Sequence, residues 1–164
     1  MFRKVTWPLL GLAFAAGVLI AQQDQLLQPS MEPTGGWNSS GEMGKTGGWT
    51  PTTVAAGVEK KPLQGKETTI TGEIVDLSCY LQLGKHGAAH ASCGSKCIAS
   101  GEPIGIVTKS GEVYLAMAEE HDPRRDGKTT FRKAAADNFA KVMTVTGTTT
   151  TVNGVKTIYV QGYL

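Results

Sequence analysis

The chain has 164 residues, a length that suits a single domain with some chain to spare. Charged residues make up 18% of the sequence, which argues against a nucleic-acid binder with a basic face. Lys and Arg number 16 and Asp and Glu number 14, so removal of Arg3 and Lys4 with an N-terminal signal would leave a neutral protein. Such a protein has no general attraction to nucleic acid or anionic lipid.

Residues 1–21 have the order of a secretory signal peptide. Arg3 and Lys4 give a positive start, an apolar stretch follows, and Ala21 offers a small residue before polar sequence. The stretch contains Pro8 and is marginal as a membrane span. We therefore expect cleavage and export rather than retention as an N-terminal anchor. The mature protein is expected to be periplasmic or secreted, without a stable membrane span, where disulfides can form.

Residues 22–66 show no periodic apolar pattern and are rich in Pro, Gly, Ser and Thr. The unit Thr-Gly-Gly-Trp occurs twice, at 34–37 and 46–49, which is too few copies to define a repeat architecture. Such a composition buries too little apolar surface to offset the entropy of ordering the chain. We expect a flexible linker, with a recognition element around the two tryptophans as the alternative.

Residues 67–164 are predicted to form a mainly β domain. β-Branched residues, alternating apolar positions and turn signals predict strands at 68–77, 104–108, 112–117, 141–147 and 155–160, and a helix at 131–140. The order of strand, long insert, two strands, helix and two strands is that of the OB-fold, a small five-stranded barrel with one helix. An open five-stranded sheet backed by the helix is the alternative. Gly72 inside the first strand suggests a bulge or a close crossing.

The insert between the first two strands holds all three cysteines and two of the three histidines. If this segment is one helix, His86, His90, Cys93 and Cys97 fall at i, i+4, i+7 and i+11 and share one stripe. Cys79 precedes the stripe, at the end of the first strand, and can fold back onto it. Thiolate and imidazole donors suit zinc or Cu(I). The expected ligands are Cys79, His90, Cys93 and Cys97, with His86 auxiliary.

Two other interpretations of the cysteines stay open. In an oxidising compartment Cys79 can pair with Cys93 or Cys97, which would staple the insert onto the barrel of a non-metal interaction module and leave one spare thiol. A bridge between Cys93 and Cys97 within a regular helix would be poorly oriented. Thiol-redox chemistry at a cysteine near His90 ranks last, because the sequence has neither Cys-x-x-Cys nor a thioredoxin-like pattern.

Other candidate residues are weaker. Asp76 lies just before the cysteine segment and can either orient a histidine or cap the following turn. His121 lies in a polar loop, where a solvated side chain is expected. The sequence has no Gly-x-Ser-x-Gly nucleophile motif and no phosphate-binding glycine loop between a strand and a helix. With no acid–base pair or nucleophile to place, the sequence points away from an enzyme.

Three short motifs carry a resemblance to a group of proteins. They are Val-Asp-Leu-Ser-Cys-Tyr-Leu at 75–81, His-x2-Cys-x3-Cys-Ile at 90–98 and Gly-x-Pro-Ile-Gly at 101–105. The pattern resembles that of small exported bacterial proteins with a single, uncharacterised cysteine-rich OB-like domain. The resemblance covers roughly residues 67–163. It implies that the cysteine segment is the signature of the group, and it implies no established activity. The expected partners are a metal ion and, as a further candidate, another exported protein.

Overall fold

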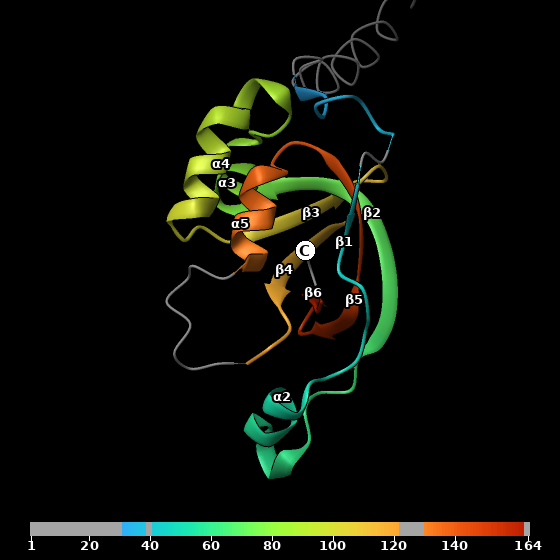
Figure 1. The fold of residues 1–164 in the computed structure, drawn as a ribbon. Helices are drawn as coiled ribbons and strands as arrows, with labels where there is room; N and C mark the ends of the chain where they lie inside the picture. Colours follow the sequence, from blue (N-terminus) through green and yellow to red (C-terminus); the bar gives the residue numbers. More distant parts are fainter. Residues whose placement is uncertain (1–30, 39–40, 122–129, 163–164) are drawn as a thin grey trace, which may run out of the picture.

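The computed structural model describes residues 31–38, 41–121 and 130–162 (Figure 1). The expected signal peptide at 1–21 lies outside these residues. Within the described residues, none of the helices has the length and apolarity needed to cross a membrane.

Five strands close into a small mixed barrel, and their course can be followed in Figure 1. They are β2 (Lys66–Asp76), β3 (Ile104–Thr108), β4 (Val113–Ala118), β5 (Val142–Val152) and β6 (Val155–Val160). β2 pairs antiparallel with β3 and β5, β3 with β4, and β5 with β6, while a parallel β4–β6 pair completes the closure. This pairing is consistent with an OB-like barrel, so the predicted fold class is confirmed and the open sheet is not formed.

The long strand β2 joins the two halves of the barrel. Its first residues pair with β5 and its last with β3, and Gly72 faces Met143 on one side and Thr108 on the other. A Cβ atom at Gly72 would lie 2.6 Å from the carbonyl oxygen of Val107. The predicted close crossing at Gly72 is therefore confirmed. The register runs through this position without an extra residue, so there is no bulge.

One helix, α5 (Thr130–Asp137), covers the core next to the barrel. Its buried face consists of Phe131, Ala135 and Ala136. The helix ends before the predicted boundary at 140 because Ala140 adopts a left-handed φ of 61° and its N–H donates to the carbonyl oxygen of Ile74 at 2.8 Å. Phe139, at 4% exposure, fills the space between this helix and the insert.

The insert between β2 and β3 is helical, as predicted. It consists of α3 (Leu77–Leu83), the short 3-10 helix η4 (Ala88–His90) and α4 (Ala91–Ser100). The expected single helix from His86 to Cys97 is wrong, because the chain leaves the helical path at Gly87, where φ is 72°. A Cβ atom at Gly87 would lie 2.3 Å from the carbonyl oxygen of Met31. His86 therefore does not share the stripe of the other three residues.

The described part of the 22–66 segment differs from the expected flexible linker. It contains β1 (Glu42–Met43), which pairs parallel with β5 outside the barrel, α2 (Pro51–Ala56) and the 3-10 helix η3 (Val58–Lys60). Met43 is 4% exposed, and the ring of Trp49 packs edge-on against that of Tyr159 with centroids 5.1 Å apart. Two apolar anchors and one strand pair thus order a stretch whose average composition suggests disorder. In Figure 1, α2 lies beyond the end of the barrel, away from α3, α4 and α5.

Candidate metal centre

Asp76 occupies the junction between the barrel and the insert. It is the last residue of β2 and the N-cap of α3, and it is fully buried. Its Oδ1 accepts hydrogen bonds from the backbone N–H groups of Ser78 at 3.0 Å and Cys79 at 3.3 Å. The capping role suggested by the sequence is confirmed. The second carboxylate oxygen, Oδ2, is buried and has no hydrogen-bond partner among the described residues.

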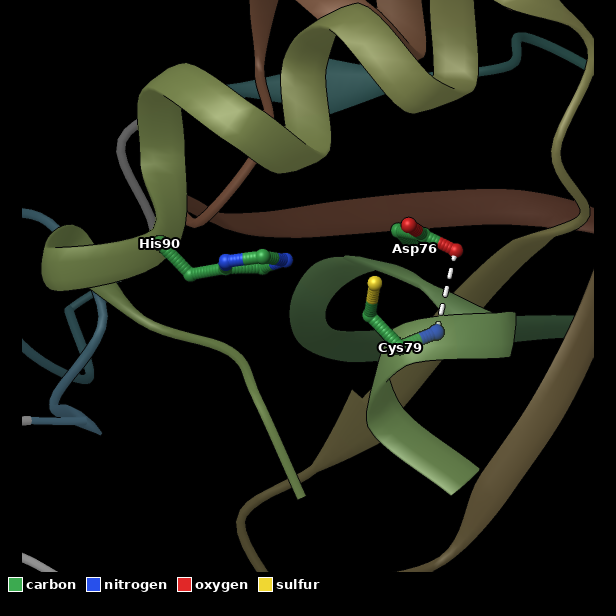
Figure 2. A group of neighbouring side chains, drawn as sticks. All are labelled: Asp76, Cys79 and His90. Atoms are coloured by element: carbon green, nitrogen blue, oxygen red, sulfur yellow. Dashed lines mark hydrogen bonds between the residues drawn. The ribbon is translucent and has the colours of Figure 1, made fainter. Parts of the chain in front are cut away.

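Cys79 and His90 meet this carboxylate from two different elements. Cys79 lies in the first turn of α3, and His90 ends η4 immediately before α4. Each offers one ligand atom, and these atoms and an oxygen of Asp76 all lie within 4.8 Å of one another (Figure 2). Tetrahedral zinc separates oxygen, nitrogen and sulfur ligands by about 3.3–3.8 Å, given its bond lengths. The three side chains therefore need to close by about 1 Å to bind one ion.

The imidazole of His90 is oriented by an aromatic contact. Its ring packs edge-on against Phe139, with centroids 5.8 Å apart and planes at 67°. Its Nε2 is buried and has no hydrogen-bond partner within the described part of the chain. Buried polar atoms in folded proteins almost always have a partner, so two unsatisfied atoms beside one thiol require an explanation. A bound cation would satisfy both.

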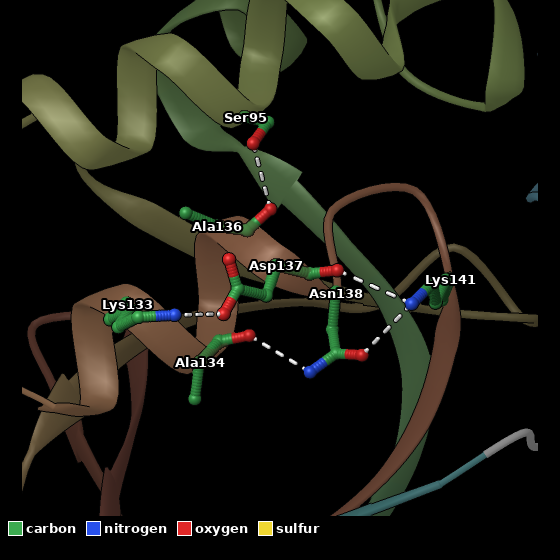
Figure 3. Close-up of polar contacts among 7 residues, drawn as sticks. All are labelled: Ser95, Lys133, Ala134, Ala136, Asp137, Asn138 and Lys141. Carbon is green, nitrogen blue, oxygen red and sulfur yellow. Dashed lines mark hydrogen bonds and ion pairs between the residues drawn. The ribbon is translucent and has the colours of Figure 1, made fainter.

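Helix α4 is docked on α5, which fixes the position of His90. A Cβ atom at Gly94 of α4 would lie 2.1 Å from Cζ of Phe139, so only glycine admits the ring at this distance. One residue on, the hydroxyl of Ser95 donates to the carbonyl oxygen of Ala136 at 2.9 Å (Figure 3). The end of α5 is held in turn by Asn138, whose side-chain amide donates to the carbonyl oxygen of Ala134. The insert thus packs against α5, the helix between strands β4 and β5.

The two remaining cysteines lie one turn apart on α4. The pKa of Cys97 is raised by burial and by the nearby Cys93 and Asp76. The pKa of Cys79 is raised to about 11, chiefly by the neighbouring Asp76 carboxylate and also by burial. All three cysteines are free thiols, with Cys93 exposed and the other two half-buried. Of the predicted ligands, Cys79 and His90 join Asp76 in the donor group of the described residues, whereas Cys93 and Cys97 lie outside it.

His86 lies against a different carboxylate, that of Glu73. Its Nδ1 lies 2.9 Å from Oε2 of Glu73, and its ring packs edge-on against Tyr80. Glu73 is fully buried on β2, and its Oε1 accepts a hydrogen bond from the backbone N–H of Gly87 at 2.6 Å. Burial raises the pKa of Glu73, while the bonds to His86 and Gly87 lower it. The pair ties the turn between α3 and η4 to the barrel, and His86 lies outside the Asp76 donor group.

Asp76 belongs to the donor group although its sequence context suggested only a cap or a residue that orients a histidine. The available signal was its position three residues before Cys79, where an N-cap directs its carboxylate toward the first helical turn. His121, the third histidine, is exposed after β4, and its backbone N–H donates to the hydroxyl of Thr53.

Comparisons with protein-family models, curated proteins and solved structures found no match to this chain. The fold and the site therefore rest on the contacts of this chain alone, and the resemblance to small exported bacterial proteins stays an expectation.

Proposed function

We propose that this domain binds one transition metal ion, zinc or copper, through Asp76, Cys79, His90 and Cys97, with Cys93 as an exchangeable thiol beside the site. One observation carries the proposal. The ligand atoms of Asp76, Cys79 and His90 lie within 4.8 Å of one another, while Asp76 Oδ2 and His90 Nε2 are buried without a partner among the described residues. A cation satisfies both atoms at once.

The proposed ligands belong to two separate parts of the fold. Asp76 and Cys79 lie where the strand β2 meets α3, and His90 and Cys97 belong to the η4–α4 part of the insert. An ion between them would cross-link the insert to the barrel. Because ligands must lose their protons to bind, the thiols of Cys79 and Cys97 beside Asp76 would exchange a proton for the metal.

The donor set favours zinc over Cu(I). Zinc accepts carboxylate, imidazole and thiolate together, whereas Cu(I) prefers sulfur ligands. With Asp76 and the thiolates of Cys79 and Cys97 ionised, the ligands would carry three negative charges against the two positive charges of Zn²⁺, and His90 would add a neutral donor. Cu(I) would instead select the three thiols and leave Asp76 as their hydrogen-bond partner. In this proposal the protein acts outside the cytoplasmic membrane, as residues 1–21 suggest, and as a binding protein rather than an enzyme.

The test is a metal titration of the reduced chain that begins at residue 22. Native mass spectrometry gives the stoichiometry, and competition with a chromophoric chelator gives the affinities for Zn²⁺ and Cu(I). We expect one ion per chain. His90→Ala and Cys79→Ala should each weaken metal binding by at least about tenfold. Loss of a residue that only hydrogen-bonds to a ligand already costs about tenfold or more, and loss of the ligand itself should cost at least as much. His121→Ala is the matched control, since this exposed histidine lies outside the donor group.

The competing function has its own signature in the same spectra. A chain with two hydrogens missing, a bridge from Cys79 to Cys93 or Cys97 and no bound metal would identify a disulfide-stapled interaction module. Equal metal affinity of His90→Ala and His121→Ala would also defeat the proposal, because it would place the ion elsewhere.

A further inference from the structure

A second candidate site lies between the barrel and the segment that crosses it at residues 49–63. Here a cavity of about 340 Å³ is bounded by strands β4, β5 and β6 and by the α2 region. Its apolar lining includes Trp49, Leu63, Met117 and Tyr159. The volume falls within the range of small-molecule sites in proteins. None of the candidate metal ligands lines this cavity, so the two sites are independent.

Two polar side chains in the wall of the cavity are incompletely satisfied. Glu119 is 2% exposed, and its Oε1 accepts a hydrogen bond from the backbone N–H of Thr50 at 2.7 Å. Its Oε2 has no partner among the residues that the structure describes, and neither has the hydroxyl of Thr150, which is 7% exposed. A buried carboxylate oxygen left unpaired attracts a cationic hydrogen-bond donor more strongly than a neutral one.

The other lining groups select the charge and shape of a ligand. The described residues that line the cavity include no lysine or arginine, and their acidic and basic side chains are those of Glu119 and His121. Trp49 and Tyr159 present aromatic rings in an edge-on pair, and Met117 adds a polarisable apolar surface. Aromatic rings attract a nearby cation and also pack against an apolar body.

We propose that this cavity binds a small amphipathic amine. The ammonium group donates to Glu119 Oε2 and Thr150 Oγ1, and the apolar part of the ligand lies against Trp49, Met117 and Tyr159.

The α2 region contacts Glu119 at the wall of the cavity. Both oxygens are shielded from solvent in this structure, so the wall beside them must shift for a ligand to reach them, and we expect the α2 region to be the part that moves. Helix α2 has no buried residue, which means that its displacement exposes little apolar core. Its links to the barrel near the cavity are polar: Thr50 to Glu119, and the Thr53 hydroxyl to the carbonyl oxygen of Glu119 at 3.0 Å.

Three ligands of similar shape and different charge test the proposal. The isotopically labelled chain is titrated with 2-phenylethylamine, 2-phenylethanol and phenylacetate, and amide and indole shifts are followed by NMR. We expect saturable shifts centred on Trp49, Thr150 and Tyr159, with the amine about tenfold tighter than the alcohol and no binding of the anion. Equal affinities for amine and alcohol, shifts centred elsewhere or no saturable shift would each overturn the proposal.

Two near-isosteric variants separate the ligand contact from the fold. In Glu119→Gln the amide oxygen can keep the bond from Thr50, which places the NH₂ group at the position of Oε2. The amine should then lose its advantage over the alcohol while the spectrum keeps its native dispersion. Thr150→Val should weaken amine binding, and Thr151→Val, at the exposed neighbour, should not. Retention of the amine preference in Glu119→Gln would contradict the proposed contact.

Discussion

Gly94 and Phe139 lie so close that a Cβ atom at Gly94 would be 2.1 Å from Cζ of the ring. The same ring packs edge-on against His90. Phe139 thus connects the helix that carries Cys93 and Cys97 to the imidazole of the candidate site. The absence of a side chain at residue 94 lets α4 approach Phe139 this closely.

Gly94→Ala should therefore destabilise the protein although alanine favours helices by about 1 kcal/mol. The added methyl group must displace the ring or the helix, and overpacking of this kind costs about 1–3 kcal/mol. Urea unfolding should show a net loss, and zinc affinity should fall because α4 moves. Ser92→Ala, at an exposed position of the same helix, is the control. If both variants were equally stable, the close packing would be wrong.

Asp76→Asn should separate the structural role of this residue from its role as a ligand. Asparagine is as good an N-cap as aspartate, so α3 and the stability of the chain should be nearly unchanged. The variant lacks the negative charge that faces Cys79 and His90, so zinc affinity should fall by at least about tenfold. Without the carboxylate the pKa of Cys79 should also drop below about 11, as measured by thiolate absorbance. Unchanged zinc affinity would show that Asp76 is not a ligand.

Glu73→Gln should change the dependence of stability on pH. Burial raises the pKa of Glu73 above its ordinary value of 4.5, with a further increase from Glu32 and opposing contributions from His86 and Gly87. A raised folded pKa stabilises the protein fully below about pH 4.5, and this contribution is lost as the pH rises through the folded value. Glutamine cannot ionise, so unfolding experiments should show the variant gaining stability relative to the parent from about pH 4 to about pH 7. Glu67→Gln, at an exposed position, is the control. If the parent instead gained stability relative to Glu73→Gln across that range, the pKa of Glu73 would be lowered rather than raised in the folded protein.

Met43→Ala tests whether the 42–49 segment is part of the folded domain. Met43 is 4% exposed and lies in β1, which pairs with β5. Truncation of a buried methionine costs about 2–5 kcal/mol, and we expect about 2 kcal/mol at this two-residue edge strand. Val58→Ala should have no effect, since this side chain is 85% exposed. Equal unfolding midpoints for the two variants would indicate a linker that contributes nothing to stability.

The sequence predicted the barrel well because its strands are specified locally. The strands Ile104–Thr108 and Val155–Val160 have the predicted bounds, since Pro103 and the Asn153–Gly154 turn mark where they begin. The helical content of the insert was also readable from its alanines and its terminal glycine, Gly101.

Long-range contacts account for what the sequence did not reveal. The break at Gly87 depends on its bond to Glu73 and on the carbonyl oxygen of Met31, which are distant in sequence. Asp76 joins the donor group because its side chain is buried at a strand end, a property that spacing alone does not encode. The ordered segment at 42–49 depends on single side chains, Met43 and Trp49, within a polar composition.

Asp76 and Ile104 face each other in the β2–β3 pair, so the insert at 77–103 leaves and re-enters the barrel at adjacent positions. The insert that carries Cys79 and His90 could therefore be accepted by another barrel of this kind without a change in strand register. Transfer would need three residues from outside the insert: the proposed ligand Asp76 and Glu73 on β2, and Phe139 after α5. The insert is thus a unit that could be transferred between barrels. Its proposed ligands could change by substitution while the strands of the barrel stay the same.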